Sequence, residues 1–183
     1  MSLIKWIVKF FMAELNYILK KHYSNHFNTL KNTSYDKNND TYLCNSTLDV
    51  LDFDGLTKSL NPHKQPSSFD CLLCNEEEKK VYCVEFKNQE KSMINNKELH
   101  NKLKDGKSSL DGILHQHNIS KDNYDFIFCV AFKASKMHYK YRRKIELTSI
   151  YFNLEKYSDK FDDIITNDIE FFTTEFHKKY SCK

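Results

Sequence analysis

Two short apolar runs joined by a charged connector constrain the fold of this chain most. They lie in the segment SSFDCLLCNEEEKKVYCVEFKNQ, where residues 69–74 and 81–86 are apolar and residues 75–80 carry most of the charge. Runs of this length, with bulky apolar residues and a polar connector between them, are typical of paired β-strands. The sequence therefore predicts an antiparallel hairpin.

The register of this hairpin determines which polar side chains meet. If Cys74 pairs with Val81, Asp70 falls directly across from Glu85. Side chains alternate between the two faces of a strand, so Lys87 shares a face with Glu85. Two carboxylates about 5 Å apart with an ammonium beside them are costly in a dry core but suit a divalent metal ion. We therefore predict a catalytic site formed by Asp70, Glu85 and Lys87.

This pattern resembles the core motif of the PD-(D/E)XK nuclease superfamily, the restriction-endonuclease-like proteins. In that motif an acidic residue at the end of one strand, here Asp70, precedes a Glu-x-Lys in the next strand, here Glu85–Lys87. The resemblance covers roughly residues 66–132. The chain departs from the motif in one respect, because Phe69 precedes Asp70 and the nearest proline is Pro66. That position varies within the superfamily.

The resemblance implies an α/β fold with a central mixed sheet of about four strands flanked by helices, and here also extra C-terminal helices. It implies an enzyme that hydrolyses phosphodiester bonds of DNA, or less favourably RNA, and leaves 5′-phosphates. Mg²⁺ or Mn²⁺ would be held by Asp70, Glu85 and the backbone carbonyl of Phe86, where it activates a water molecule. Lys87 would position that water or stabilise the transition state.

Length and composition indicate one domain over residues 1–183. The chain has only three Gly and two Pro, which favours long elements with few tight turns. Charged residues interrupt the apolar N-terminus, so the sequence predicts no membrane span. The cysteines lie mostly within strand-like runs, as buried reduced thiols do. We therefore expect a cytoplasmic protein.

Three further acids are candidates for an additional ligand of the site. Residues 3–22 have the periodicity of an amphipathic helix, and Glu14 lies at the edge of its apolar face, where a carboxylate is either a boundary residue that reaches solvent or an active-site acid. The superfamily often supplies an additional acid from its first helix, which makes Glu14 a candidate metal ligand. Asp52 and Asp54 are alternatives, in a segment whose secondary structure the sequence leaves open.

Residues 97–117 have the apolar periodicity of a second long helix. Gly106 lies within its apolar stripe, where a glycine either permits close approach to the sheet or breaks the helix. Residues 125–132 form an almost continuous apolar run, which predicts a central strand buried on both faces. Residues 136–165 are expected to be mainly helical.

Basic residues in two places are candidates for nucleic-acid contact. Three lysines of the second helix lie off its apolar stripe, and three basic residues follow the predicted central strand with aromatic residues interleaved. These candidates are Lys102, Lys104, Lys107, Arg142, Arg143 and Lys144. Solvated surface is the alternative for both groups.

Two other functions remain open at this stage. The chain could be a non-catalytic nucleic-acid-binding module on the same fold, or a partner-binding protein in which Asp70, Glu85 and Lys87 form an ordinary salt-bridged cluster. The sequence leaves the specificity, the choice of endo or exo cleavage, and the biological role undetermined. Double-strand cutters of this size often act as symmetric pairs, so a homodimer also remains open.

Overall fold

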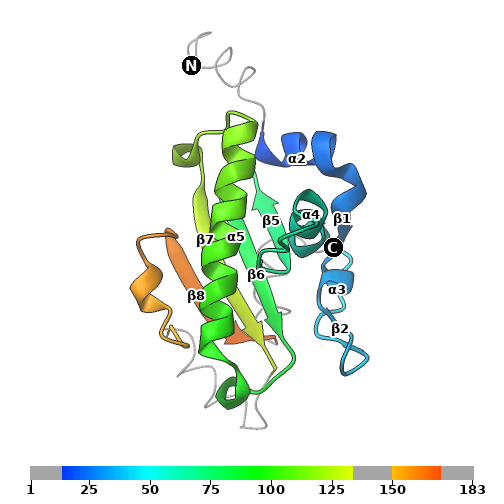
Figure 1. Ribbon diagram of the computed structural model, residues 1–183, viewed down its shortest axis with the longest axis vertical. Coiled ribbons are helices and arrows are strands. Elements are labelled where there is room, and N and C mark those ends of the chain that lie inside the picture. The colour runs from blue at the N-terminus through cyan, green and yellow to red at the C-terminus, as the bar shows by residue number, and fades with distance from the viewer. Residues whose placement is uncertain (1–13, 134–149, 170–183) are drawn as a thin grey trace.

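The computed structural model describes residues 14–133 and 150–169. At its centre lies a six-stranded sheet with the order β1-β4-β5-β6-β7-β8 (Figure 1). Neighbouring strands are antiparallel from β1 to β6, whereas β7 runs parallel to β6 and β8 parallel to β7. The strands are β1 (Phe27–Thr29), β4 (Asp49–Asp52), β5 (Cys71–Asn75), β6 (Lys80–Lys87), β7 (Asp125–Phe132) and β8 (Asp163–Asp168).

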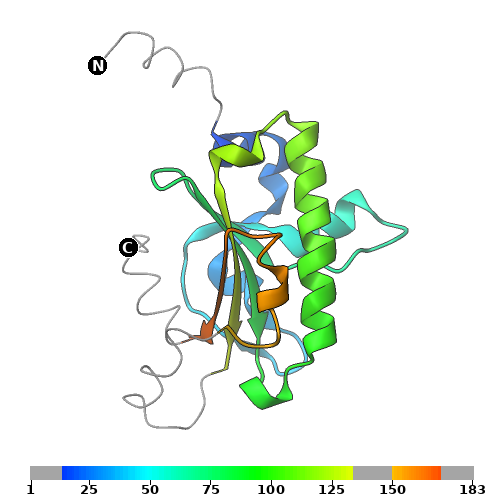
Figure 2. The same cartoon turned by 90° about the vertical axis from the view of Figure 1, so that its left-hand side faces the viewer.

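Four α-helices and a separate small hairpin accompany the sheet in the described part of the chain. The helices are α2 (Leu15–Tyr23), α3 (Leu30–Thr33), α4 (Phe53–Leu60) and α5 (Asn96–Gln116). Strands β2 (Tyr35–Asp36) and β3 (Thr41–Tyr42) form the hairpin. Helix α5 runs along one face of the sheet and connects β6 to β7, as Figure 2 shows. The mixed α/β class expected from the sequence is therefore confirmed.

The predicted hairpin and its register are confirmed. Strands β5 and β6 pair with Cys74 opposite Val81, and the ladder continues to Cys71 opposite Val84. The turn occupies the four residues between the strands, where the side chain of Asn75 accepts hydrogen bonds from two backbone N–H groups. This side chain satisfies donors that a tight charged turn would otherwise leave to solvent.

Alternation along β6 separates its side chains between two hydrophobic clusters. Val81 and Cys83 belong to the larger cluster, on the side of α5, whereas Tyr82, Val84 and Phe86 belong to the cluster on the opposite face. Because side chains alternate along a strand, Glu85 shares a face with Val81 and Cys83 and therefore lies on the α5 side. The apolar alternation of the sequence therefore directs the predicted site toward α5.

Helix α5 is continuous, so Gly106 permits close packing and does not break the helix. The side chain of Asn95 caps the first turn by accepting from two backbone N–H groups. A Cβ atom built on Gly106 would lie 2.6 Å from the ring of Phe69. That ring is fully buried and stacks on Phe53 with centroids 4.4 Å apart. The ring therefore has little freedom to move away.

We expect Gly106→Ala to destabilise the protein, although alanine is the better helix former by about 1 kcal/mol. Overpacking against a fixed aromatic ring costs roughly 1–3 kcal/mol, so the net loss should be up to about 2 kcal/mol. Gly112 provides the matched control, because no atom lies within 4 Å of a Cβ built there. Gly112→Ala should leave the free energy of unfolding unchanged or raise it. Urea denaturation of both variants measures the difference, and equal stability would contradict this packing.

The number of strands and the C-terminal part of the described chain differ from the expectation. The sheet has six strands, so the expectation of about four strands is wrong. Residues 163–168 form strand β8, where a mainly helical segment was expected, because parallel pairing with β7 outweighs a weak local pattern. The helical expectation for residues 136–165 is also wrong over residues 150–162, which are loop apart from the 3₁₀ helix Glu155–Tyr157, and its remaining part, residues 136–149, lies outside the described residues.

Within the described ranges, no helix is long and apolar enough to cross a membrane. Five cysteines of these ranges have free thiols, and four of the five are buried. Burial raises the pKa of the Cys74 thiol to about 12, which keeps it protonated at neutral pH. Cys71 and Cys74 belong to the clusters on opposite faces of the sheet, so this CxxC pair does not converge on one metal ion.

Candidate active site

The predicted site lies at the carboxyl end of β6, where the chain leaves the sheet toward α5. The register of β5 and β6 ends with Cys71 opposite Val84, and just before β5 the backbone N–H of Asp70 donates to the carbonyl of Val84 over 2.9 Å. Asp70 therefore lies next to the end of β6, where its charge acts on Glu85. In α/β sheets, ligands bind beyond the carboxyl ends of parallel strands, and β6 and β7 are such a pair.

One lysine of α5 bridges the two carboxylates. The Nζ atom of Lys102 lies 2.8 Å from Oε1 and 2.9 Å from Oε2 of Glu85. The same Nζ lies 3.5 Å from Oδ1 of Asp70. A single positive charge thus sits between oxygens contributed by the start of β5 and the end of β6. Asp70 and Glu85 therefore point to the same side of the sheet and converge on one cation position.

Glu85 is the most deeply buried acid of this cluster, with 0% of its surface exposed. Burial raises the pKa of its carboxyl to about 8, and the neighbouring charge of Asp70 acts in the same direction. Lys102 and Lys87 oppose this rise but do not cancel it. A buried carboxyl whose pKa is raised in this way is stabilised in its charged form by a cation held beside it, as Lys102 is here.

Lys87 lies on the same face as Glu85, as predicted. Its Nζ is 3.1 Å from Oε1 of Glu85 and also pairs with Glu98 in the first turn of α5. Burial lowers the pKa of Lys87, but Glu85 and Glu98 more than offset burial and the net pKa is raised. The side chain is only 12% exposed, which restricts its position, and the two acids keep its ammonium charged.

Asp70 is fixed by the backbone of β6. Its Oδ2 accepts a hydrogen bond of 2.7 Å from the N–H of Phe86. The carbonyl of Lys87 accepts a hydrogen bond from the backbone N–H of Lys133, just after β7, so the Lys87 backbone faces β7. Because the backbone groups of successive strand residues point to alternate sides, those of Phe86 face the other way, toward Asp70. Burial raises the pKa of the Asp70 carboxyl, while Lys102 and the Phe86 N–H oppose that rise.

The three candidates for an additional acid differ in position. Asp54 lies closest, because its backbone N–H approaches the Asp70 carbonyl at 3.4 Å, and its charge raises the pKa of Asp70. Its own carboxylate pairs with Lys58 and Ser68. Asp52 caps α4 through a 2.8 Å bond from Gly55.

Glu14 lies at the other end of the sheet. It immediately precedes Leu15 and Asn16, whose N–H groups bond to Tyr124 and Glu76 beside the β5–β6 turn. The full length of β5 separates that turn from Asp70. Glu14 is therefore not brought to the carboxylates, and Asp54 is the upstream acid nearest to them.

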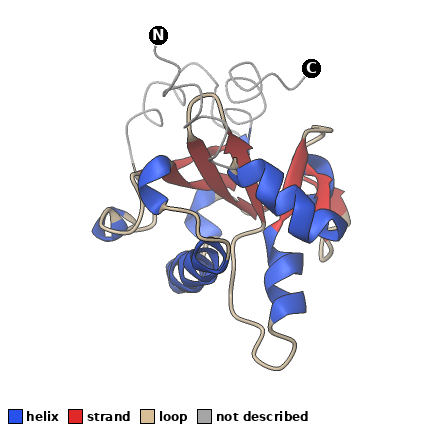
Figure 3. Cartoon of the chain, turned by 90° about the horizontal axis from the view of Figure 1, so that it is seen from above, coloured by secondary structure: helices blue, strands red, loops and turns tan. Residues whose placement is uncertain are grey.

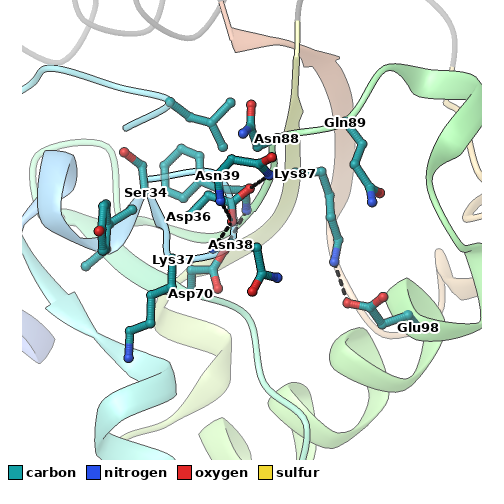
Figure 4. A pocket seen from close by; sticks show the side chains of 14 residues that line it. Ser34, Asp36, Lys37, Asn38, Asn39, Asp70, Lys87, Asn88, Gln89 and Glu98 are labelled. Atoms are coloured by element: carbon teal, nitrogen blue, oxygen red, sulfur yellow. Dashed lines mark hydrogen bonds and ion pairs between the residues drawn. The ribbon is translucent and has the colours of Figure 1, made fainter. Parts of the chain in front are cut away.

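A polar pocket of about 330 Å³ opens beside the site (Figure 4). The small β2–β3 hairpin and the residues just before it form one wall. The end of β6, the residues after it and the first turn of α5 form the other. Asp70 and Lys87 line this pocket, whereas Glu85 is buried behind them and does not.

The basic residues predicted to contact nucleic acid lie in different places in the structure. Lys102 belongs to the site itself, whereas Lys107 pairs with Asp111 and lies over the ring of Phe126, one to two turns farther along α5. Lys104 is exposed and lies over the ring of Tyr157. Arg142, Arg143 and Lys144 are outside the described residues.

The bridging position of Lys102 was missed, although the sequence contains a signal for it. Lys102 follows Leu99 by three residues and precedes Gly106 by four, and both of these neighbours are buried. Residues at this spacing share one face of a helix. The side chain of Lys102 therefore projects toward the sheet, and its head reaches the carboxylates at the end of β6.

Comparisons with known proteins leave this site to be interpreted from its geometry. No protein-family model, no curated protein and no solved structure matches the chain. Among the described residues, no cluster of three or more His, Cys, Asp or Glu side chains could hold a metal ion. The carboxylates that share a cation position are thus a pair.

Proposed function

We propose that this protein is a metal-dependent nuclease of the PD-(D/E)XK type. The observation that carries the proposal is the convergence of Asp70 and Glu85 on one cation, at distances of 2.8–3.5 Å from the Nζ of Lys102. Lys87, the lysine of the Glu-x-Lys motif, lies against the same carboxylate. A buried acid pair with one raised pKa, next to a polar pocket, is the kind of cluster that active sites contain.

The donor set suits Mg²⁺ or Mn²⁺. Both ions prefer hard oxygen ligands, and Mg²⁺ is commonly held by only one or two carboxylates, with water and substrate phosphate completing its shell. Asp70, Glu85 and the carbonyl of Phe86 would supply the protein ligands. When bound, such an ion lowers the pKa of a water molecule and neutralises charge on the scissile phosphate.

The two lysines then have different roles. Lys87 is kept charged by Glu85 and Glu98 and is positioned to orient the attacking water or to stabilise the transition state. Lys102 occupies the cation position of the metal-free protein, where it neutralises the carboxylate pair. Metal binding requires that this ammonium leave the space between Asp70 and Glu85.

The substrate follows from the motif resemblance, which favours DNA over RNA and 5′-phosphate products. The same resemblance is compatible with a homodimer. The competing account is a non-catalytic binding module in which the lysines and acids form a permanent salt-bridged cluster. The bridging contact of Lys102 favours that account, because every carboxylate of the cluster already has an ammonium partner.

A cleavage assay distinguishes the two accounts. Purified protein should degrade labelled DNA when Mg²⁺ or Mn²⁺ is present and leave it intact in EDTA. Asp70→Asn should reduce the rate by at least about 100-fold, because the cation loses one of its two carboxylate ligands. Asp105→Asn, an exposed aspartate of α5, is the matched control and should cut normally. Absence of any metal-dependent cleavage of DNA or RNA would support the binding module.

A further inference from the structure

The pocket beside the site is bounded by an element that the proposed chemistry does not use. Strands β2 and β3 form a two-stranded sheet of their own, separate from the central sheet. Asp36 fixes this hairpin, because its carboxylate accepts from the side chain of Asn39 and hydrogen-bonds with Asn88 just after β6. Figure 4 shows the hairpin residues on one side of the pocket and the Lys87–Glu98 pair on the other. The hairpin is therefore attached at the edge of the candidate active site.

This hairpin carries two exposed aromatic rings. Tyr35 and Tyr42 are cross-strand partners whose ring centroids lie 4.8 Å apart at an interplanar angle of 35°. Tyr35 lines the pocket, and the two side chains remain 37% and 44% exposed. Cross-strand pairing explains why the rings touch each other. It does not bury them, and a ring exposed next to an active site can stack on a planar ligand.

The remaining walls are rich in carboxamides and poor in available positive charge. Asn38, Asn88 and Gln89 line the pocket, and each offers both a hydrogen-bond donor and an acceptor. Lys87, which also lines it, is ion-paired with acids. Figure 4 shows Lys37 extending away from Lys87. The phosphate backbone of a duplex requires clustered cations, whereas the edge of an unpaired base requires donors and acceptors together with a stacking surface.

We propose that this pocket binds one unpaired nucleotide next to the scissile phosphate. The inference rests on the proposed nuclease function and names its substrate as a single-stranded segment, such as a loose end or a loop. The base stacks on Tyr35 and its edge hydrogen-bonds with the carboxamides. Because Asp70 and Lys87 line the same pocket, the phosphate of that nucleotide lies beside these two side chains.

Fluorescence anisotropy with labelled oligonucleotides tests this proposal. Ca²⁺ replaces Mg²⁺ in the assay, and one sequence is presented both as a single strand and as a duplex. Tyr35→Ala should weaken single-strand binding roughly 5- to 150-fold, which is the range expected from the loss of one base–aromatic stack. Tyr35→Phe keeps the ring and should bind like the wild type. Gln89→Ala, on the opposite wall, should also weaken single-strand binding, and duplex binding should change less than about twofold in every variant.

Tyr17 provides the matched control, since it is 62% exposed on α2, away from the pocket. Tyr17→Ala should bind both oligonucleotides normally. Equal losses on single strand and duplex, or wild-type affinity in both Tyr35→Ala and Gln89→Ala, would overturn the proposal. Cleavage in Mn²⁺ is measured in parallel, so the two proposals can fail separately. Ring-dependent single-strand binding without cleavage would support the pocket and refute the nuclease. Cleavage together with unchanged binding in the pocket variants would support the nuclease and refute the nucleotide pocket.

Discussion

Replacing Lys87 with alanine should abolish cleavage while the protein stays folded and continues to bind Mn²⁺. Loss of one group that stabilises the transition state typically lowers the rate by about 100- to 1000-fold. The fold should survive, because Lys102 still neutralises Glu85 from the other side at 2.8 Å. Single-turnover cleavage at saturating Mn²⁺ measures the rate, and isothermal titration calorimetry measures the retained metal binding.

Lys104→Ala is the control for this variant. Lys104 lies on α5 but is exposed beside Tyr157, so its loss should leave the cleavage rate within about threefold of wild type. A Lys87→Ala protein that cuts at the wild-type rate would remove Lys87 from the mechanism. A variant that has lost Mn²⁺ binding as well would make Lys87 a structural part of the metal site.

Replacing Lys102 with methionine should change metal affinity in the opposite direction. The ammonium occupies the cation position, so its removal should strengthen Mn²⁺ binding by about 10- to 100-fold, because repulsion between like charges at a few ångströms amounts to several kcal/mol at intermediate dielectric. In EDTA the same variant should be less stable by roughly 1–3 kcal/mol, since Glu85 loses a partner but retains Lys87.

Lys104→Met is the matched control for this second prediction, because Lys104 lies on the same helix but is exposed beside Tyr157. Its Mn²⁺ affinity and its stability in EDTA should equal those of the wild type. Calorimetry measures the first quantity, and urea denaturation with and without Mn²⁺ measures the second. If Lys102→Met binds Mn²⁺ more weakly than wild type, Lys102 supports the metal site and does not compete for it.

The central hairpin and the site on it could be predicted because the information is local. Alternation between Val81 and Phe86 fixes which side chains share a face, and one pairing between β5 and β6 fixes all the others. The same is true of α5 and β7, whose apolar patterns are long and strong. Asp70, Glu85 and Lys87 came together for this reason, without information from the rest of the chain.

The sheet edges and the upstream acid could not be predicted in this way. Only three residues of β8 have a strong preference for strands, and the residues that follow them are polar. The strand forms because it pairs with β7, which is distant in the sequence. Asp52 and Asp54 lie where β4 passes directly into α4, so neither a strand nor a helix period extends far enough to be recognised. The proximity of Asp54 to Asp70 arises from that junction. Viewed from above, the helices lie mainly to one side of the sheet (Figure 3).

A crystal structure of the wild-type protein soaked in Mn²⁺ would show whether the carboxylate pair holds a metal, because anomalous scattering identifies the ion without reference to activity. We expect one Mn²⁺ peak between the carboxylates of Asp70 and Glu85, within about 2.0–2.4 Å of their oxygens. We also expect the Nζ of Lys102 to move away from both carboxylates. A structure with no peak at this position, in which Lys102 still bridges Asp70 and Glu85 at saturating Mn²⁺, would contradict the metal site and the nuclease proposal with it.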